Sequence, residues 1–582
     1  MGSNLGAVEL TMALHLSLEL PKDKIIWDVG HQSYTHKLLT GRRDGFESLR
    51  QFHGMSGFPK RKESECDAFD TGHSSTSVSA GLGLVKARDI KGEEHTVVSV
   101  IGDGSLTGGM AYEALNNAAK IETNYIIVLN DNNMSISENV GGVSKYLNNI
   151  RTARSYQGLK KKVYDALLSS PGGEGVVSGI RKAKNSVKQL VIPGMLFEDM
   201  GITYLGPVDG HNIDSVTRVL EEAKRVKGAV LVHVITEKGK GFAPAERHPA
   251  RFHGAEPFDI ESGLPKKPRT VSNYTDVFAT IMCKLGQRDE KVVAITAAMP
   301  GGTGLLEFRE RFPNRLFDVG IAEEHAVSMA GGLAKQGMVP VVAIYSTFLQ
   351  RGYDQIMQDV ALAGQHVVFA IDRAGLVGED GPTHHGVFDV GFLRQIPGMT
   401  VLAPANFEQL KSMLRWAVNE CNGPVAVRYP RGSTQYGADS FAGRPEAVVQ
   451  HTMGEDATVI CYGTILNEAM MASRMLIGNG KTDDVSVQVL SLPSPTHYSR
   501  EELAEKVKGK HVFVIEEVCH GSGISGDIAL SLRKAGLDCT VHAIDLGEKF
   551  VPHGDMRSLY RLTGIDNGCI CNHIREVMIH EN

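Results

Sequence analysis

The chain lacks three features that would assign it to other classes of protein. No run of about 18 apolar residues occurs, so no transmembrane helix is expected. No basic block is longer than residues 160–162 and the net charge is −6, which argues against nucleic-acid binding. Only eight cysteines are spread over 582 residues, which is typical of reduced thiols in the cytoplasm.

Two local patterns add to these limits. Residues 1–20 are partly apolar but carry Glu9 and Glu19, and they have neither a basic leader nor a small-residue cleavage site. A secretory signal is therefore not expected, and we predict a cytoplasmic protein. Near the end of the chain, Cys569, Cys571 and His573 leave a zinc or redox site open as an alternative, although no second cysteine pair stands nearby.

The sequence is instead rich in glycine, with 64 residues, and many of them follow apolar runs typical of β-strands. Val97–Ile101 is one such run, residues 110–119 are typical of a helix, and Tyr125–Leu129 is the next run. This order predicts a βαβ unit with two parallel strands. Ligands of such sheets bind at the carboxyl ends of the strands, where Asp103 and Asn132 are found.

The alternation of strands and helices continues to the end of the chain, and 582 residues are too many for one core. We therefore expect an α/β protein of three successive α/β domains with mostly parallel sheets. A polar, proline-spaced stretch separates the first two, and a polar break at about 435–453 precedes the third. The expected parts are a first domain at 1–245 with a helical insertion at about 143–195, a linker at 246–271, a second domain at 272–436 and a C-terminal domain at 454–582.

Asp103, in a Gly-Asp-Gly turn, and Asn132, in an Asn-Asp-Asn turn, are candidates for a magnesium–diphosphate anchor. Magnesium prefers hard oxygen ligands in octahedral geometry. A carboxylate, an amide oxygen and a main-chain carbonyl at Met134 would supply three of them, and a diphosphate two more. One negative charge rather than two avoids repelling the diphosphate, and the glycines let the backbone approach the phosphates. The alternative is that Gly-Asp-Gly is an ordinary turn.

Glu323 is the second candidate for cofactor chemistry. It follows the segment 318–322 and precedes an apolar helix from Ala326, which predicts a position at a strand-to-helix turn. A carboxyl group in a dry site can have a raised pKa and bond a ring nitrogen. A cofactor held by a metal at one end and activated by a glutamate at the other is the thiamine diphosphate arrangement. The alternative is that Glu323 only interacts with the helix dipole.

Seven further stretches, together with these motifs, match a known family. They are residues 27–32, 72–77, 134–139, 345–351, 371–375, 381–386 and 428–432. The chain resembles the 1-deoxy-D-xylulose-5-phosphate synthases, which belong to the transketolase-like family of thiamine diphosphate enzymes. The resemblance covers essentially the whole chain. A general transketolase would share the metal motif but not residues 345–351 or 428–432 in this form.

The resemblance implies roles for the matching residues. Magnesium would be held by Asp103, Asn132 and Met134. The cofactor would be contacted by His31, Gly72, His73, Ser74, Gly104, Ser105, Asn132, Phe242 and Glu323, with Phe242 standing where many members have tyrosine. The catalytic residues would be Glu323, His31, His384 and His253, and the substrate side would be lined by Tyr345, Arg351, Arg373, Asp380 and Arg431.

Two of these roles have structural alternatives. Arg373 and Arg431 are expected to hold a phosphate, for which arginine is better suited than lysine, but each could instead pair with a carboxylate at a domain interface. Each of His31, His253 and His384 could serve only as a structural hydrogen-bonding group.

The implied activity is the condensation of pyruvate with D-glyceraldehyde 3-phosphate, which releases carbon dioxide and gives 1-deoxy-D-xylulose 5-phosphate. This is the first step of the non-mevalonate isoprenoid pathway and also feeds thiamine and pyridoxal synthesis. The enzyme would transfer a two-carbon unit, use thiamine diphosphate and Mg²⁺, and form a homodimer, with no nucleic-acid or membrane partner.

Two alternatives to this activity stay open. One is another transketolase-type thiamine enzyme. The other is a protein that binds the cofactor but is catalytically weak, because family members carry a Gly-Gly-His segment just ahead of the Ser-Asn-Leu-Gly seen at residues 3–6. On that ground we expect folded protein that binds cofactor but turns over slowly without the segment.

Overall fold

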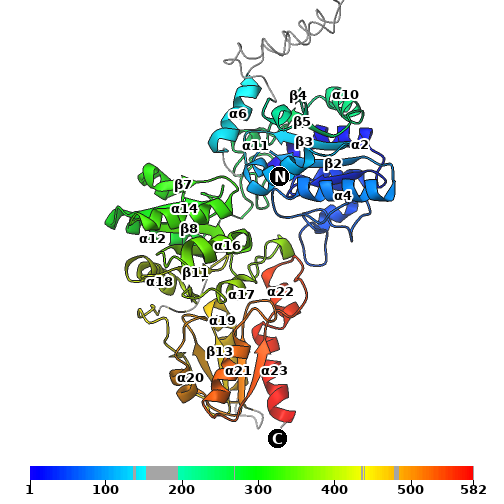
Figure 1. The fold of residues 1–582 in the computed structure, drawn as a ribbon. Helices are drawn as coiled ribbons and strands as arrows, with labels where there is room; N and C mark the ends of the chain where they lie inside the picture. The colour runs from blue at the N-terminus through cyan, green and yellow to red at the C-terminus, as the bar shows by residue number, and fades with distance from the viewer. Residues whose placement is uncertain are drawn as a thin grey trace, which may run out of the picture. The chain divides into compact units, whose positions relative to one another are not determined.

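The computed structural model describes residues 1–135, 139–152, 195–267, 269–433, 437, 439–477 and 484–580. The chain divides into two compact units, each of which is described by itself (Figure 1). The first unit comprises Met1–Arg43 and Phe58–Lys266, and the second comprises Asp44–Gly57 and Lys267–Asn582. Of the helical insertion predicted at 143–195, residues 153–194 lie outside the described residues.

The first unit is built on a five-stranded parallel sheet with the strand order β1-β2-β3-β5-β4. The predicted βαβ unit is confirmed, because β2 and β3 are parallel neighbours joined by α5. The strands are β1 (Lys24–Trp27), β2 (Val97–Gly102), β3 (Tyr125–Asp131), β4 (Thr203–Asp209) and β5 (Ala229–Ile235). The helices are α1 (Gly2–Leu5), α2 (Val8–Ser17), α3 (Tyr34–Leu39), α4 (Ser77–Lys91), η2 (Ser105–Thr107), α5 (Gly109–Ala118), α6 (Gly141–Thr152), α9 (Met195–Asp199), α10 (Ile213–Ala223) and α11 (Ala243–Arg247). The short helix η1 (Arg43–Ser48) belongs, apart from Arg43, to the second unit.

Both faces of this sheet are covered by helices, as its continuous apolar strands require. Because side chains alternate along a strand, Ile127 and Leu129 of β3 pack with α4, α5 and α6, whereas Ile126 and Val128 pack with α2 and α10. α2 and α10 can be followed on one side of the sheet and α4 on the other in Figure 1. The carboxyl ends of the strands, where Asp103 and Asn132 follow, stay outside these two apolar layers.

Part of the stretch predicted as a linker packs on the first unit. Phe252 and Phe258 surround Phe242, with ring centroids 5.5 Å and 5.8 Å from that of Phe242. A bridge joins Phe258 to Pro265, and the unit ends at Lys266. Three aromatic rings therefore hold about twenty residues of the predicted linker against the first unit, although the sequence of this stretch shows no periodicity.

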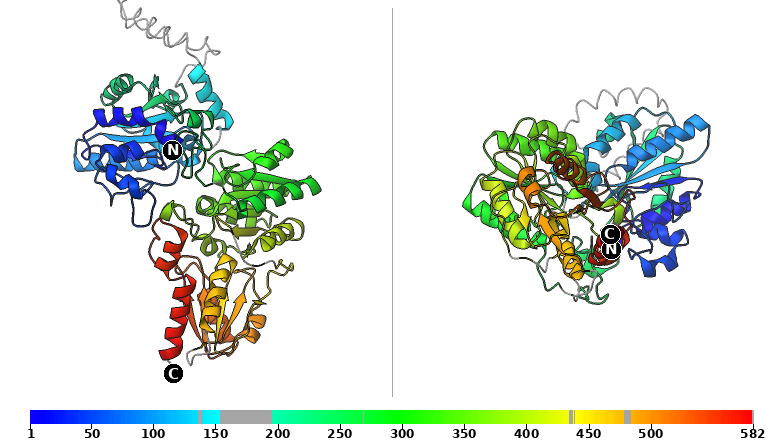
Figure 2. Two further views of the ribbon diagram at one scale, coloured as in Figure 1. Left: turned by 180° about the vertical axis from the view of Figure 1, so that it is seen from behind. Right: turned by 90° about the horizontal axis from the view of Figure 1, so that it is seen from below.

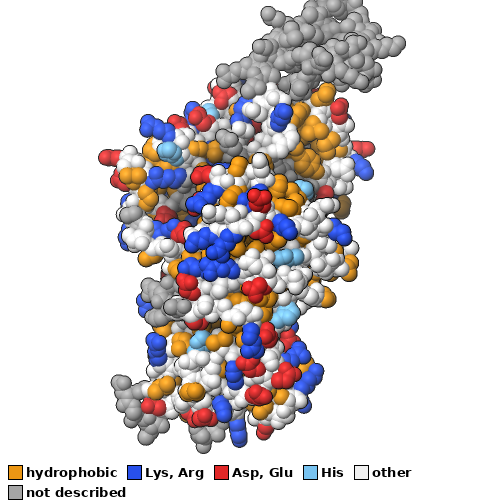
Figure 3. Space-filling model, turned by 90° about the vertical axis from the view of Figure 1, so that its left-hand side faces the viewer, with side chains coloured by type: hydrophobic (Ala, Val, Ile, Leu, Met, Phe, Trp, Pro, Cys, Tyr) orange, Lys and Arg blue, Asp and Glu red, His pale blue; other side chains and the backbone are white. Residues whose placement is uncertain are grey.

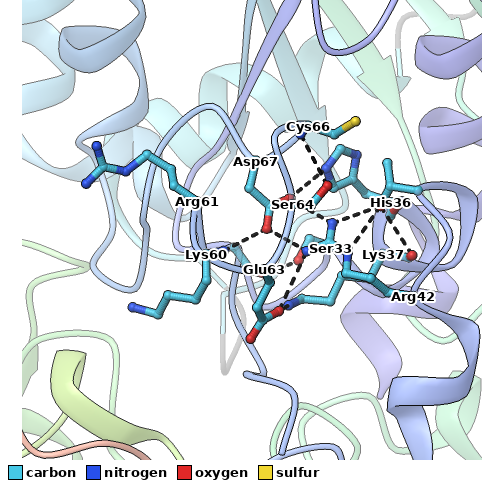
Figure 4. Close-up of polar contacts among 12 residues, drawn as sticks. Ser33, His36, Lys37, Arg42, Lys60, Arg61, Glu63, Ser64, Cys66 and Asp67 are labelled. Carbon is cyan, nitrogen blue, oxygen red and sulfur yellow. Dashed lines mark hydrogen bonds and ion pairs between the residues drawn. The ribbon is translucent and has the colours of Figure 1, made fainter.

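A buried polar cluster lies where the chain leaves the first unit after Arg43 and re-enters it at Phe58 (Figure 4). Asp67 accepts both guanidinium donors of Arg42, at 2.6 Å and 2.8 Å, and lies 3.0 Å from His36 Nε2. Lys37, whose side chain is fully buried, pairs with Glu63 at 2.6 Å. The ion pairs thus join residues just before the departure to residues just after the return.

Replacing Asp67 by asparagine is expected to destabilise the protein by about 3–5 kcal/mol, because it leaves Arg42 and His36 buried without their partner. Although burial works against it, the contacts with Arg42 and His36 hold the pKa of Asp67 well below its usual range. Its stabilising contribution is therefore complete at neutral pH and is lost as the pH falls below the unfolded-state pKa of about 4. Urea denaturation followed by circular dichroism at several pH values measures both effects.

Asp70→Asn is the matched control, because Asp70 makes a longer, 3.4 Å pair with Arg61 whose side chains are 37% and 67% exposed. Its loss should change stability by less than about 1 kcal/mol. Equal effects of the two substitutions would show that the buried cluster does not stabilise the fold.

The second unit contains a six-stranded parallel sheet with the order β10-β11-β9-β8-β6-β7. Its core lies between the sheet and α12 and α18. The strands are β6 (Val292–Thr296), β7 (Leu316–Asp318), β8 (Val339–Tyr345), β9 (Val368–Asp372), β10 (Thr400–Leu402) and β11 (Val425–Tyr429). The helices are α12 (Tyr274–Arg288), α13 (Leu306–Arg311), η3 (Pro313–Arg315), α14 (Glu323–Lys335), α15 (Ser346–Leu349), η4 (Gln350–Gly352), α16 (Tyr353–Gln355), η5 (Ile356–Ala361), η6 (Gly381–Thr383), α17 (Asp389–Leu393) and α18 (Phe407–Asn419).

The same unit contains a second sheet with the order β12-β14-β13-β15-β16, parallel except for β12. One face packs on α19 and α23, which lie side by side, and the other on α20 and α21 (Figure 2). The strands are β12 (Val449–Gln450), β13 (Ala457–Cys461), β14 (Val487–Ser491), β15 (His511–Ile515) and β16 (Thr540–Ile544). The helices are η7 (Gly463–Ile465), α19 (Leu466–Leu476), α20 (Arg500–Lys506), α21 (Ser525–Lys534), α22 (Met556–Thr563) and α23 (Asn567–His580).

The cysteine pair near the end of the chain does not form a metal site. Cys571 is buried in the apolar core between α23 and the sheet, whereas Cys569 is half-buried. All eight cysteines are free, and no group of three or more metal-binding His, Cys, Asp or Glu side chains occurs among the described residues. Cys569, Cys571 and His573 are thus not gathered into a metal-binding group in the described part of the chain.

The surface is mixed in character. Acidic and basic side chains are interspersed on the face drawn in Figure 3, with hydrophobic side chains between them. Within the described part of the chain, no helix has both the length and the apolar character needed to cross a bilayer.

Candidate active site

Asp103 lies at the carboxyl end of β2 and is almost completely buried. Its main-chain N donates to Asn130 O at 3.2 Å, while its carboxylate atom Oδ2 has no hydrogen-bond partner. Burial, and then the negative charge of Asp131, raise the pKa of Asp103 well above its ordinary value. A buried carboxylate oxygen that accepts no hydrogen bond is suited to bind a cation.

The backbone beside Asp103 leaves no room for larger side chains. A Cβ atom on Gly104 would lie 2.7 Å from Ser135 Cβ. The next residue, Ser105, is fixed through its carbonyl, which accepts from Ser75 Oγ at 2.7 Å. Glycine at 104 therefore allows the segment to pass close to the turn after β3.

Asn132 is the first residue after β3 and lies in a tight turn. Its Oδ1 accepts from Met134 N at 3.0 Å, and Asn133 has a left-handed φ of +63°. Asp131 Oδ1 accepts from Asn133 N at 3.2 Å. Two side-chain-to-backbone hydrogen bonds thus shape the turn that contains Asn132 and Met134, the candidate ligands.

Asp28 holds the segment that carries Gly72, His73 and Ser74. It follows β1, and its two carboxylate oxygens accept from Ser75 N at 2.8 Å and Ser77 N at 3.1 Å. Ser75 adopts a left-handed φ of +68°, which reverses the chain just before α4. The turn 72–74 is therefore fixed at the same edge of the sheet as Asp103.

His31 and His253 lie together in the first unit, with ring centroids 4.9 Å apart. The His31 loop is held by Asn4, whose Nδ2 donates to His31 O at 2.8 Å. Lys238 Nζ donates to Ser135 O at 2.5 Å and lies 3.0 Å from His253 Nδ1. Burial, and then the charges of Lys238 and His31, lower the pKa of His253 well below its ordinary value, so its ring is neutral at pH 7.

Lys238 brings a positive charge to the same region. It is buried, which lowers its pKa to about 8, and the charge of Asp103 works in the opposite direction. Phe242 follows four residues later at the start of α11, where it belongs to the aromatic cluster with Phe252 and Phe258. The ring of Phe242 is half-buried.

In the second unit, Glu323 is the first residue of α14 and is 3% exposed. Its Oε2 has no hydrogen-bond partner and lies 3.8 Å from Arg351 Nη1. Burial raises the pKa of Glu323 to about 7, and the Arg351 charge only partly opposes this shift. At neutral pH this carboxyl group can hold a proton and offer it to an acceptor.

Tyr345 and Arg373 lie at the ends of the neighbouring strands β8 and β9. The Arg373 guanidinium carbon is 4.1 Å from the centre of the Tyr345 ring. Arg373 Nη1 donates to Asp372 Oδ2 at 2.6 Å and to Gly302 O at 2.9 Å, and the residue has a left-handed φ of +62°. The guanidinium is therefore positioned by neighbours of its own domain.

Asp380 is shared between two arginines. Arg50 Nη1 donates to its Oδ1 at 2.5 Å, and Arg431 Nη1 lies 3.7 Å from its Oδ2. Burial works against ionisation, but the charges of His384, Arg50 and Arg431 hold the pKa of Asp380 below its usual range. His384 follows η6, and its ring packs edge-on against Phe348.

The arrangement fits a cation-bound diphosphate in the first unit and an aminopyrimidine ring in the second. The orphaned Asp103 Oδ2 and the close approach at Gly104 fit the diphosphate end. The orphaned, protonatable Glu323 Oε2 fits a ring nitrogen.

Comparison with known proteins assigns the chain to a family. The family model described as 1-deoxy-D-xylulose-5-phosphate synthase matches residues 1–236, and those described as the pyrimidine binding domain and the C-terminal domain of transketolase match residues 271–436 and 446–570. The 1-deoxy-D-xylulose-5-phosphate synthase of Lachnoclostridium phytofermentans is 49% identical over 583 residues, which cover 99% of this chain and 92% of that protein. The chain belongs to the 1-deoxy-D-xylulose-5-phosphate synthase family.

Other 1-deoxy-D-xylulose-5-phosphate synthases show similar agreement. Those of Heliobacterium modesticaldum and Clostridium botulinum (strain Alaska E43) are 48% and 47% identical, each over 99% of this chain and over 89% and 92% of the relative. Among solved structures, transketolase from Leishmania mexicana matches 100% of this chain and 95% of its own at 17% identity, with a TM-score of 0.45. The two transketolase domain models and the mostly parallel sheets confirm the predicted transketolase-like α/β fold.

Three side chains that lie beside the predicted site residues of this 1-deoxy-D-xylulose-5-phosphate synthase family member were not predicted from its sequence. Lys238 lies beside His253, Asp131 beside Asn132, and Arg50 beside Asp380. A lysine three residues after β5, at the carboxyl edge of the sheet, was a usable signal for Lys238. Nothing local marks Arg50, because the segment Asp44–Gly57 belongs by its contacts to the second unit.

Proposed function

We propose that the protein condenses pyruvate with D-glyceraldehyde 3-phosphate, releases carbon dioxide and forms 1-deoxy-D-xylulose 5-phosphate. The observation that carries this proposal is the buried Glu323 carboxyl group, whose Oε2 accepts no hydrogen bond and whose pKa is raised to about 7, in a chain of this family. The protein acts as a homodimer, which size-exclusion chromatography with light scattering can check.

In the first unit, Asp103, Asn132 and the Met134 carbonyl hold Mg²⁺, which binds the diphosphate. The segment Gly104–Ser105 and the turn Gly72–Ser74 bring main-chain donors to the phosphates, which suits anions at the carboxyl edge of a parallel sheet. Lys238 balances the added negative charge, and the Phe242 ring packs beside the cofactor. His31 and His253, whose rings lie together, would be available for proton transfer near the bound cofactor.

In the second unit, Glu323 holds a proton for the aminopyrimidine ring. Bound thiamine diphosphate supplies the nucleophilic carbon and the electron sink of the decarboxylating condensation. The neutral His253 ring can accept a proton, and His31 and His384 donate or accept protons at the substrate oxygens.

The substrate side orients the two carbonyl compounds. Arg373 and Arg431 bind the phosphate of the aldehyde through forked donors, and Tyr345 and Arg351 orient the pyruvate carboxylate. Asp380 keeps Arg431 in place through the 3.7 Å ion pair.

Mass-spectrometric product analysis tests the proposal. Incubation with pyruvate, D-glyceraldehyde 3-phosphate, thiamine diphosphate and Mg²⁺ is expected to give 1-deoxy-D-xylulose 5-phosphate and one carbon dioxide for each product molecule. Formation of a ketose phosphate from a ketose donor instead of pyruvate would identify a transketolase. Binding of thiamine diphosphate without carbon dioxide release would overturn the proposed activity.

A further inference from the structure

Three buried polar side chains from three neighbouring strands form a continuous chain in the first unit. Tyr204 Oη lies 2.7 Å from His233 Nδ1, and His233 Nε2 lies 2.9 Å from Asp131 Oδ2. None of the three residues is more than 5% exposed. His233 lies in β5, between β3 with Asp131 and β4 with Tyr204, so the alternation of side chains brings all three to one face of the sheet.

The chemistry of the three groups fixes the direction of the hydrogen bonds. Burial raises the pKa of Tyr204, so its hydroxyl keeps its proton and can donate. The Asp131 carboxylate faces the His233 ring nitrogen and the Arg151 guanidinium and has only oxygen atoms to offer, so it accepts from both. His233 consequently accepts from Tyr204 at Nδ1 and donates from Nε2 to Asp131.

The other oxygen of Asp131 shapes the turn after β3. Asp131 Oδ1 accepts from Asn133 N at 3.2 Å and also contacts the guanidinium of Arg151. Asn133 has a φ of +63°, a left-handed conformation that asparagine tolerates and that the hydrogen bond of its main-chain N stabilises. Asn132 lies between Asp131 and Asn133 in this turn. The orientation of the Asp131 carboxylate therefore decides where the Asn132 side chain and the Met134 carbonyl point.

We propose that Tyr204, His233 and Asp131 are positioning residues that hold the turn Asp131–Met134 in the shape required by the cation site. The inference rests on the proposed function, because it concerns the support of the same site. A ligand held by fixed neighbours loses little freedom on binding a cation, and partners of metal ligands typically contribute 10- to 100-fold to affinity.

Tyr204→Phe tests the inference with the smallest change, since it removes only the hydroxyl group of the hydrogen-bonded series that lies farthest from the turn. Magnesium is titrated into the protein at saturating thiamine diphosphate and binding is followed by calorimetry. We expect an apparent Mg²⁺ affinity about three- to tenfold lower for Tyr204→Phe and about 10- to 100-fold lower for His233→Ala. His233→Gln, whose amide can donate to Asp131 and accept from Tyr204, should recover part of the loss. At saturating Mg²⁺, kcat should stay close to that of the unchanged protein.

Tyr125→Phe is the matched control, because Tyr125 is the first residue of β3, the strand that ends at Asp131, and is also buried. Its hydroxyl lies 2.8 Å from Ser99 Oγ and 2.8 Å from Val78 O, far along the strand from the turn. It should lose stability as Tyr204→Phe does but keep the Mg²⁺ affinity. Equal Mg²⁺ affinities of Tyr204→Phe and Tyr125→Phe would overturn the inference. If the unchanged protein showed no Mg²⁺-dependent cofactor binding, the proposed function itself would fail.

Discussion

Glu323→Ala is expected to abolish turnover, with a loss of at least about 100-fold in kcat, because general acid–base groups typically contribute 10²- to 10⁴-fold. The thiamine diphosphate affinity should fall by less than about tenfold, since the diphosphate end is bound by other residues. The physical reason is the environment of the carboxyl group. Glu323 is 3% exposed, and its Oε2 has no hydrogen-bond partner other than what a ligand would bring.

Steady-state kinetics and calorimetric cofactor titration separate the two expected effects. Glu324→Ala is the matched control, because Glu324 lies in the same first turn of α14 and is half-buried. A role limited to the helix dipole would give similar, small effects for both substitutions. Near-normal kcat in Glu323→Ala would disprove its assignment.

The raised pKa of Glu323 also predicts a pH effect on the cofactor-free protein. Its folded-state pKa of about 7 exceeds the unfolded value of 4.5, so its contribution to stability is complete below pH 4.5 and is lost as the pH rises toward 7 and beyond. Glu323→Gln removes this dependence. The melting temperature of Glu323→Gln should therefore exceed that of the unchanged protein at pH 8 more than at pH 5.

The strands and the positions of the candidate ligands could be predicted from sequence because they depend on local order. Apolar runs such as Val97–Ile101 and Tyr125–Leu129 are short and rich in β-branched residues, which is typical of buried strands, and the residues that follow them lie at the carboxyl edge of the sheet. Asp103, Asn132 and Glu323 were found in this way. That the first two and the third bind opposite ends of one cofactor stays a prediction.

Other features depend on contacts between distant segments and leave no local signal. Arg50 reaches Asp380 across 330 residues of sequence, and His233 reaches Asp131 across 102. The rings of Phe252 and Phe258 give order to a stretch whose proline spacing is typical of a linker. Sequence periodicity predicts which face of a helix or strand is buried, but it does not predict which polar side chain from a distant segment contacts that face.

Asp103→Ala is expected to lower thiamine diphosphate affinity in the presence of Mg²⁺ by more than about 100-fold, since it removes a direct ligand and partners of ligands alone contribute 10- to 100-fold. The same change should leave the cofactor-free protein equally stable or more stable. Asp103 has a buried Oδ2 with no donor, and burial and then the charge of Asp131 raise its pKa well above the ordinary value. The favourable charges nearby do not outweigh these two effects, so the ionised carboxylate destabilises the unliganded fold.

Thermal unfolding with and without Mg²⁺ and thiamine diphosphate measures both effects, because a ligand that binds only the folded state raises the melting temperature. The ligand-induced rise should disappear in Asp103→Ala and persist in Glu113→Ala, which changes an exposed carboxylate on the adjacent helix α5. A variant that is less stable without ligands yet keeps the rise would show that Asp103 is a structural residue. Loss of the rise together with unchanged or higher basal stability is the signature of a carboxylate that the fold keeps buried for a cation.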